Sequence, residues 1–177
     1  MHSRTLWVIP ALVLTSLVTA SAEAPILGRN IGSWKLADFR GREWSSSEFT
    51  DRKFQVVAFF GVECPLAKQY APVLQRIADE FADQGVSVVI LDSNRHDSLT
   101  EMAAFARQFD VRVPVLKDLN NVIADRLGAE RTPEVFVLDP AGKVRYHGRI
   151  DDQHSVGGRS RPEPTRHDLR QALEDLC

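Results

Sequence analysis

Cysteine, net charge and long hydrophobic runs are all scarce in this sequence. Its 177 residues include two cysteines, Cys64 and Cys177, which can pair in an oxidising compartment if the fold brings them together. A net charge of −2 provides no bulk attraction to nucleic acid or to an anionic membrane. The five histidines are scattered without the close spacing of metal ligands, so we expect neither a metal site nor another cofactor.

The N-terminal apolar run is too short to cross a bilayer as a helix. It covers residues 6–18, whereas a spanning helix needs about 20 apolar residues. A positively charged start precedes the run and small residues follow it, which is the pattern of a cleaved secretory signal. We therefore predict a signal peptide over residues 1–24, one domain over residues 25–177, and a periplasmic or extracellular location. An uncleaved N-terminal anchor is the alternative.

Strand-like and helix-like patterns alternate along the rest of the chain. Apolar runs predict strands at 54–60, 86–93, 113–118, 134–139 and 143–150. Apolar residues at helical spacing predict helices at 66–81, 99–109, 120–128 and 165–176, the last opened by a capping box. The lead-in, 25–53, predicts two short strands about a turn at 40–42. This order is typical of an α/β domain with a central mixed sheet, helices on both faces and a hairpin-like N-terminal extension.

Cys64 lies where the first long strand is expected to give way to a helix. The unpaired N–H groups of a first helical turn, and the positive end of the helix dipole, favour the thiolate there. Lys68, one turn on, adds a positive charge on the same face, and Glu63 opposes it. A small buried hydrophobic residue without chemical role is the alternative interpretation of Cys64. We expect a reactive thiol.

Three markers stand in register along the chain. Cys64-Pro65 marks the joint between strand and helix, Pro72 lies eight residues after the cysteine inside the helix, and Thr132-Pro133 directly precedes the closing hairpin. Together they resemble the thioredoxin superfamily over roughly residues 30–150. The lead-in strands and the stretch TPEVFVLDPAGKVRY are most similar to its redoxin branch, which holds AhpC/TSA (peroxiredoxin-like) proteins and secreted thiol-disulfide oxidoreductases.

The resemblance implies a thioredoxin-like fold with Cys64 as the catalytic residue. It also implies a cis peptide bond before Pro133, which would present the backbone of Thr132 to a substrate beside the thiol. Pro65 and Lys68 are expected to support the cysteine from the start of the helix.

The sequence departs from the family pattern at the active site itself. The four-residue motif reads Cys64-Pro65-Leu66-Ala67, so the second, resolving cysteine is absent. Gly61 stands where peroxiredoxins have a threonine, and Ala58 stands where thioredoxins have a buried acid.

A single thiol can begin disulfide exchange but needs another group to finish it. We therefore expect an exported monothiol oxidoreductase that acts on protein or small-molecule thiols and disulfides, with no nucleic acid as partner and no membrane contact beyond export. A one-cysteine thiol peroxidase and a non-catalytic peptide-binding module are the alternatives. Cys177 is a candidate resolving thiol, although we expect the fold to keep it away from Cys64.

Overall fold

The computed structural model describes residues 25–154 and 160–177 of the chain. The predicted signal peptide, residues 1–24, lies outside this part and stays a prediction. Within the described residues, no helix is both long and apolar enough to cross a membrane.

The described chain folds into seven strands and four α-helices in the predicted order. The strands are β1 (Lys35–Asp38), β2 (Glu43–Ser45), β3 (Phe54–Phe59), β4 (Val86–Asp92), β5 (Val115–Lys117), β6 (Glu134–Leu138) and β7 (Val144–Gly148). The helices are α1 (Pro65–Phe81), α2 (Leu99–Gln108), α3 (Val122–Leu127) and α4 (Asp168–Leu176). Three short 3-10 helices complete the list: η1 (Ser46–Phe49), η2 (Ala82–Gln84) and η3 (Leu119–Asn121).

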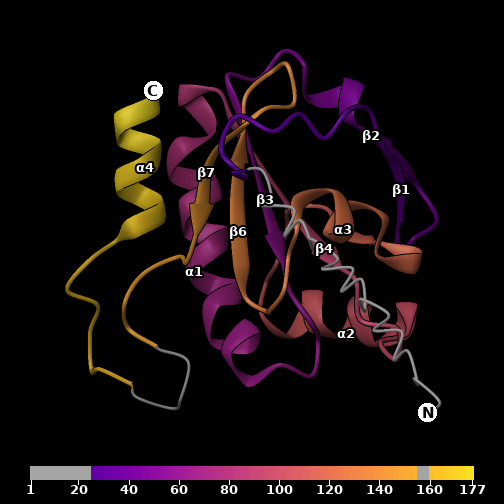
Figure 1. Ribbon diagram of the computed structural model, residues 1–177. Coiled ribbons are helices and arrows are strands. Elements are labelled where there is room, and N and C mark those ends of the chain that lie inside the picture. The colour runs from indigo at the N-terminus through magenta and orange to yellow at the C-terminus, as the bar shows by residue number, and fades with distance from the viewer. Residues whose placement is uncertain (1–24, 155–159) are drawn as a thin grey trace, which may run out of the picture.

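The strands form one mixed sheet in the order β2-β1-β5-β4-β3-β6-β7. β3 lies at its centre, parallel to β4 and antiparallel to β6, and β1 joins the lead-in hairpin to the sheet through β5. The β1–β2 hairpin and α4 lie on opposite sides of the molecule (Figure 1). The mixed sheet and the N-terminal hairpin confirm the predicted thioredoxin-like architecture.

Alternation along the central strand builds two hydrophobic cores, one on each face of the sheet. Val56 and Ala58 point into the core covered by α1, α2 and α4, whereas Val57 and Phe59 point into the other. α3 and the lead-in segment cover that second face. A strand buried on both faces needs apolar residues at every position, which explains the continuous run in the sequence.

The C-terminal helix begins later than the sequence predicted. We expected a capping box at Thr165, but α4 starts at Asp168, and no side chain caps it. The backbone N–H and the hydroxyl of Thr165 both donate to the carboxylate of Asp152, each at 2.7 Å. Thr165 therefore ties the preceding segment to the region after β7 instead of starting the helix. The observed strand β5 is also shorter than predicted: it covers Val115–Lys117, whereas the sequence predicted a strand at 113–118.

Candidate functional site

Cys64 lies at the joint between β3 and α1 and is the N-cap residue of the helix. Its N–H donates to the carbonyl of Gly61 at 3.0 Å, which closes the turn between strand and helix. Pro65 occupies the first helical position, where the missing N–H has no intrahelical acceptor to lose. The cysteine is half-buried and stands at the end of the helix where backbone N–H groups lack intrahelical partners.

The thiol reaches across to the loop that precedes β6. Cys64 Sγ donates to the carbonyl oxygen of Thr132 at 3.3 Å. The Thr132–Pro133 bond is cis, as the resemblance implied. The fold thus brings Cys64, Pro65, Thr132 and Pro133 together, although 68 residues separate the cysteine from the threonine.

Glu134 anchors this loop from inside the protein. Its carboxylate is buried, with 2% of the residue exposed. Glu134 Oε2 accepts the backbone N–H groups of Glu130 at 2.8 Å and Arg131 at 3.3 Å, and its Oε1 lies 2.6 Å from Nε2 of His147. Because Pro133 directly precedes this carboxylate, these bonds hold the loop that faces the thiol.

Asp97 anchors the other side of the cysteine. Its buried carboxylate accepts the N–H of Val62 at 2.8 Å through Oδ2 and the amide of Asn94 at 2.9 Å through Oδ1. A Cβ placed on Gly61 would lie 3.6 Å from Asp97 Oδ2 and 3.9 Å from the Cβ of Cys64. The carboxylate of Asp97 therefore lies beside the turn that carries the cysteine.

A buried ion pair supports the Asp97 loop. Lys117 Nζ donates to Asp92 Oδ1 at 3.0 Å and to the backbone carbonyls of Asn94 and Asp97 at 2.5 and 2.7 Å. Burial raises the pKa of Asp92 to about 6, although the hydrogen bond and charge of Lys117 oppose that rise. Lys117 thus holds the loop after β4 in place through its hydrogen bonds to two backbone carbonyls of that loop.

Lys68 forms an ion pair with Glu63, whereas from the sequence we expected it to support Cys64. Its Nζ lies 3.6 Å from Glu63 Oε2, so its positive charge is shared with the carboxylate that precedes Cys64. Glu63 is exposed and Lys68 is partly exposed, and such surface pairs contribute about 0–1 kcal/mol.

Cys177 does not approach Cys64. Both cysteines are free thiols. Arg170 of α4 pairs with Glu80, which lies at the far end of α1 from Cys64, and Cys177 follows α4 (Figure 1). The 17 residues of α1 correspond to about 25 Å, whereas a disulfide needs Cα atoms within about 7 Å.

Sequence reasoning did not identify Asp97, Glu134 or Lys117 as part of the site. A signal was present for Glu134 and for the partner of Lys117, because a charge interrupts or ends an apolar strand pattern. Glu134 opens the run EVFVL, and Asp92, the partner of Lys117, ends VSVVILD. Nothing in the sequence distinguishes Asp97 from the other polar residues of its loop.

A model of the AhpC/TSA family matches residues 27–147, which is more than half of the chain. The chain belongs to the AhpC/TSA family. Among curated proteins, it is 24% identical over 118 residues to the thiol-disulfide oxidoreductase ResA of Bacillus thuringiensis, a match that covers 67% of this chain. The chain spans 66% of the length of that relative.

Solved structures of other proteins have the same fold. A hypothetical protein from Sinorhizobium meliloti superposes with a TM-score of 0.77 and 29% identity, over 87% of this chain and 85% of that one. A putative thiol:disulfide interchange protein DsbE from Chlorobium tepidum superposes with a TM-score of 0.65 and 20% identity, over 85% and 94% of the two chains. The second likeness supports the fold alone. The match to the AhpC/TSA family supports membership of the redoxin branch of the thioredoxin superfamily.

Proposed function

We propose that this AhpC/TSA protein is a monothiol oxidoreductase, with Cys64 as its catalytic residue, that acts on protein or small-molecule disulfides. The observation that carries the proposal is the position of the thiol, at a helix N-terminus and 3.3 Å from the carbonyl of Thr132 beside a cis-proline. Reactive cysteines are often found at helix N-termini. The similarity to ResA supports the same class of reaction.

The exchange begins when Cys64 loses its proton to solvent and the thiolate attacks one sulfur of a substrate disulfide. The S–S bond of the substrate breaks, one substrate sulfur joins Cys64 in a mixed disulfide, and the other leaves as a thiolate. No net electrons are lost in this step, because one disulfide replaces another.

Release of the mixed disulfide requires a thiol from outside the chain. Ala67 occupies the position of the resolving cysteine and Cys177 lies beyond the far end of α1, so neither supplies an internal thiol. An external thiolate that attacks the bound substrate sulfur forms a new disulfide and returns Cys64 to its starting state. We also propose that residues 1–24 direct export and that the reaction takes place outside the cytoplasm.

Turnover of a glutathionylated peptide, with glutathione as the reductant, tests the proposal. Wild type should deglutathionylate the peptide, Cys64→Ser should lose at least about 99% of the rate, and Cys177→Ser should retain it. Equal rates for wild type and Cys64→Ser would refute a catalytic role for Cys64.

A parallel assay of hydrogen peroxide consumption tests the peroxidase alternative. Gly61 offers no hydroxyl to orient a peroxide, and the carboxylate of Asp97 borders the space that a side chain there would enter. Peroxide consumption that depends on Cys64 and exceeds peptide turnover would replace the proposal by a peroxidase. Activity in neither assay would favour a binding module.

A further inference from the structure

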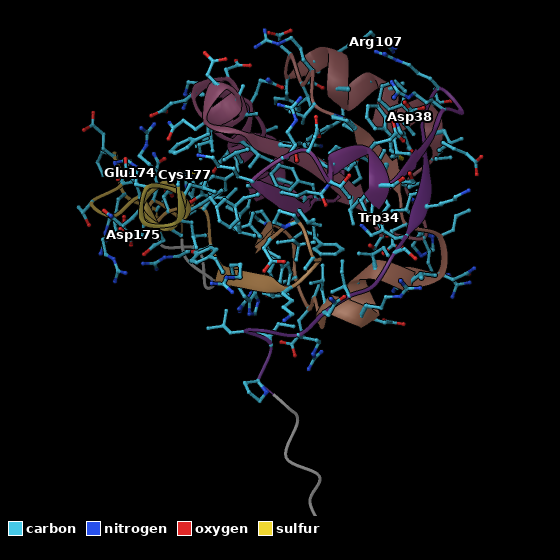
Figure 2. The ribbon with its side chains drawn as sticks, turned by 90° about the horizontal axis from the view of Figure 1, so that it is seen from above. Trp34, Asp38, Arg107, Glu174, Asp175 and Cys177 are labelled. Carbon is cyan, nitrogen blue, oxygen red and sulfur yellow. The ribbon has the colours of Figure 1, made fainter. Side chains whose placement is uncertain are left out.

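A large cleft opens beside the β1–β2 hairpin. Its volume is about 880 Å³. β1 and the start of η1 form one wall, the loop after β4 and the start of α2 form another, and η3 with α3 form the third. Trp34 and Asp38 belong to this side of the molecule, and Cys177 lies at the opposite side (Figure 2).

Exposed apolar side chains gather in this cleft. Among the residues that the structure describes, four large hydrophobic residues are exposed, and three of them line it: Leu99 at 48%, Leu119 at 66% and Val122 at 42%. The fourth, Leu27, lies elsewhere. Three separate segments thus turn apolar residues toward one space, an arrangement that marks a ligand surface more often than isolated exposed residues do.

The exposed charges of the lining are all positive. Lys35, Arg95 and Arg126 are exposed there, and in the described part of the chain no carboxylate forms an ion pair with any of them. Arg126 Nη1 is held by the carbonyls of Ile31 and Ser33, at 3.2 and 2.9 Å.

The carboxylates of the lining are buried and already engaged. Asp97 accepts the bonds described above. Burial tends to raise the pKa of Asp38, but the indole N–H of Trp44 and the backbone N–H groups of Arg40 and Arg42 outweigh burial and lower it. An occupant therefore meets an apolar surface bordered by cations, on a protein whose net charge is negative.

We propose that this cleft binds a small amphipathic organic anion, a carboxylate or sulfonate attached to an alkyl or aryl group. Small-molecule sites have volumes of roughly 300–1,000 Å³, apolar walls and a few polar groups that fix orientation. The apolar group lies against Leu99, Leu119 and Val122, and the anion lies toward the cations. An added peptide strand does not suit this site, because both edges of β1 are already paired, with β2 and β5.

The cleft is a separate site from Cys64, although one residue, Asp97, belongs to both. Asp97 lines the cleft and also holds the N–H of Val62 beside the cysteine. Ligand binding does not require the thiol, so Cys64→Ser should bind the ligand as wild type does. Failure of the oxidoreductase proposal therefore leaves this one testable.

Calorimetric titration of the full chain with decanoate, below its micelle concentration, tests the proposal, with decanol as the uncharged probe. Decanoate should bind saturably at one site, and decanol at least about tenfold more weakly. Lys35→Glu combined with Arg95→Glu should weaken decanoate binding at least about tenfold. Val122→Glu should also weaken decanoate binding at least about tenfold, because it places a negative charge in the apolar wall. We expect this variant to fold, because a negative charge at the start of α3 interacts favourably with the helix dipole.

Matched controls lie outside the cleft. Leu27→Glu places the same charge on the remaining exposed apolar residue, and Arg76→Glu reverses an exposed cation of α1. Both should bind decanoate within about twofold of wild type, and thermal unfolding should show that all variants remain folded. The proposal is overturned by absence of saturable binding, by equal affinity for decanol, or by equal losses in cleft and control variants.

Discussion

Two carboxylates hold the backbone segments on either side of Cys64, although neither lies near it in the sequence. Asp97 holds the N–H of Val62, and Glu134 holds the loop that ends in Pro133. Buried carboxylates that accept several N–H groups fix the backbone strongly, because charged acceptors make stronger hydrogen bonds than neutral ones. At the scale of the residue, the site is therefore a thiol held between two anchored backbone segments.

Replacing Asp97 with Asn should disturb this arrangement more than its small change of shape suggests. Both partners of the carboxylate, the N–H of Val62 and the amide of Asn94, are donors, so an amide sets one of its own N–H groups against a donor. We expect a loss of about 1–3 kcal/mol in the free energy of unfolding and a slower exchange reaction. Urea unfolding and peptide turnover measure the two effects.

Asp83→Asn serves as the control, because Asp83 is exposed on η2. It should leave both stability and turnover nearly unchanged. An Asp97→Asn protein that matches this control in both measurements would show that Asp97 does not position the cysteine.

At the scale of the element, α1 carries the thiol at its start and the core along its length. Ala67, in the position of the resolving cysteine, is fully buried in the core that α1 shares with the sheet. A second thiol at this position would therefore be shielded from solvent, close to Cys64 on the same turn of the helix. At the position of the second cysteine, this protein therefore has the buried methyl side chain of Ala67.

Ala67→Cys should convert the protein into a dithiol oxidoreductase. The new thiol lies three residues after Cys64 and can resolve the mixed disulfide within the chain. We expect the variant to reduce insulin disulfides with a dithiol donor at least about tenfold faster than wild type. The larger side chain should cost about 1–3 kcal/mol of stability, because the position is closely packed.

Ala67→Ser is the matched control, because the hydroxyl oxygen of serine occupies the same position as the sulfur of cysteine but cannot form a disulfide. It should share part of the loss of stability and gain no insulin reductase activity. If wild type already reduces insulin as fast as Ala67→Cys, then an efficient external or unrecognised resolver acts on Cys64.

At the scale of the whole molecule, the buried Asp92 makes stability depend on pH. Its Oδ2 has no hydrogen-bond partner among the described residues, and burial raises its pKa from 3.8 to about 6. The folded protein therefore holds this proton more tightly than the unfolded chain does. The resulting stabilisation is complete below about pH 4 and is lost as the pH rises through about 6.

Comparison of wild type with Asp92→Asn isolates this effect, because asparagine does not titrate. The free energy of unfolding of wild type, relative to that of the variant, should fall by up to about 3 kcal/mol between pH 4 and pH 7. Urea unfolding of both proteins at several pH values measures it. A difference that stays constant or rises with pH would contradict the raised pKa.

Oxidation should join whole molecules through Cys177. This thiol is exposed at the end of α4 (Figure 2). The ion pair between Arg170 and Glu80 places α4 beside the end of α1 that lies away from Cys64. Oxidised protein should therefore run as a mixture of monomer and dimer on non-reducing gels, and Cys177→Ser should remove most of the dimer while Cys64 remains open to alkylation. A loss of about 2 Da in the oxidised monomer, absent in Cys177→Ser, would instead indicate an intramolecular bond.

Local patterns in the sequence were sufficient to predict the order of the elements and the position of the thiol. Strands buried on both faces must be continuously apolar, and helices that cover a sheet must have apolar residues at helical spacing, so β3, β4, α1 and α2 could be recognised. The error at Thr165 has a related cause. Its capping pattern is local, but the buried carboxylate of Asp152 binds it in the folded chain.

The surroundings of the thiol were decided by the tertiary structure. β3 and β4 are parallel and β6 is antiparallel to β3. The C-terminal ends of β3 and β4 therefore lie beside the N-terminal start of β6. The loops at these strand ends bring Val62 to Asp97 across 35 residues and Cys64 to Thr132 across 68. The strand order sets these distances, and spacing along the chain does not record them. The sequence therefore identifies the nucleophile, whereas the sheet selects the groups that hold it.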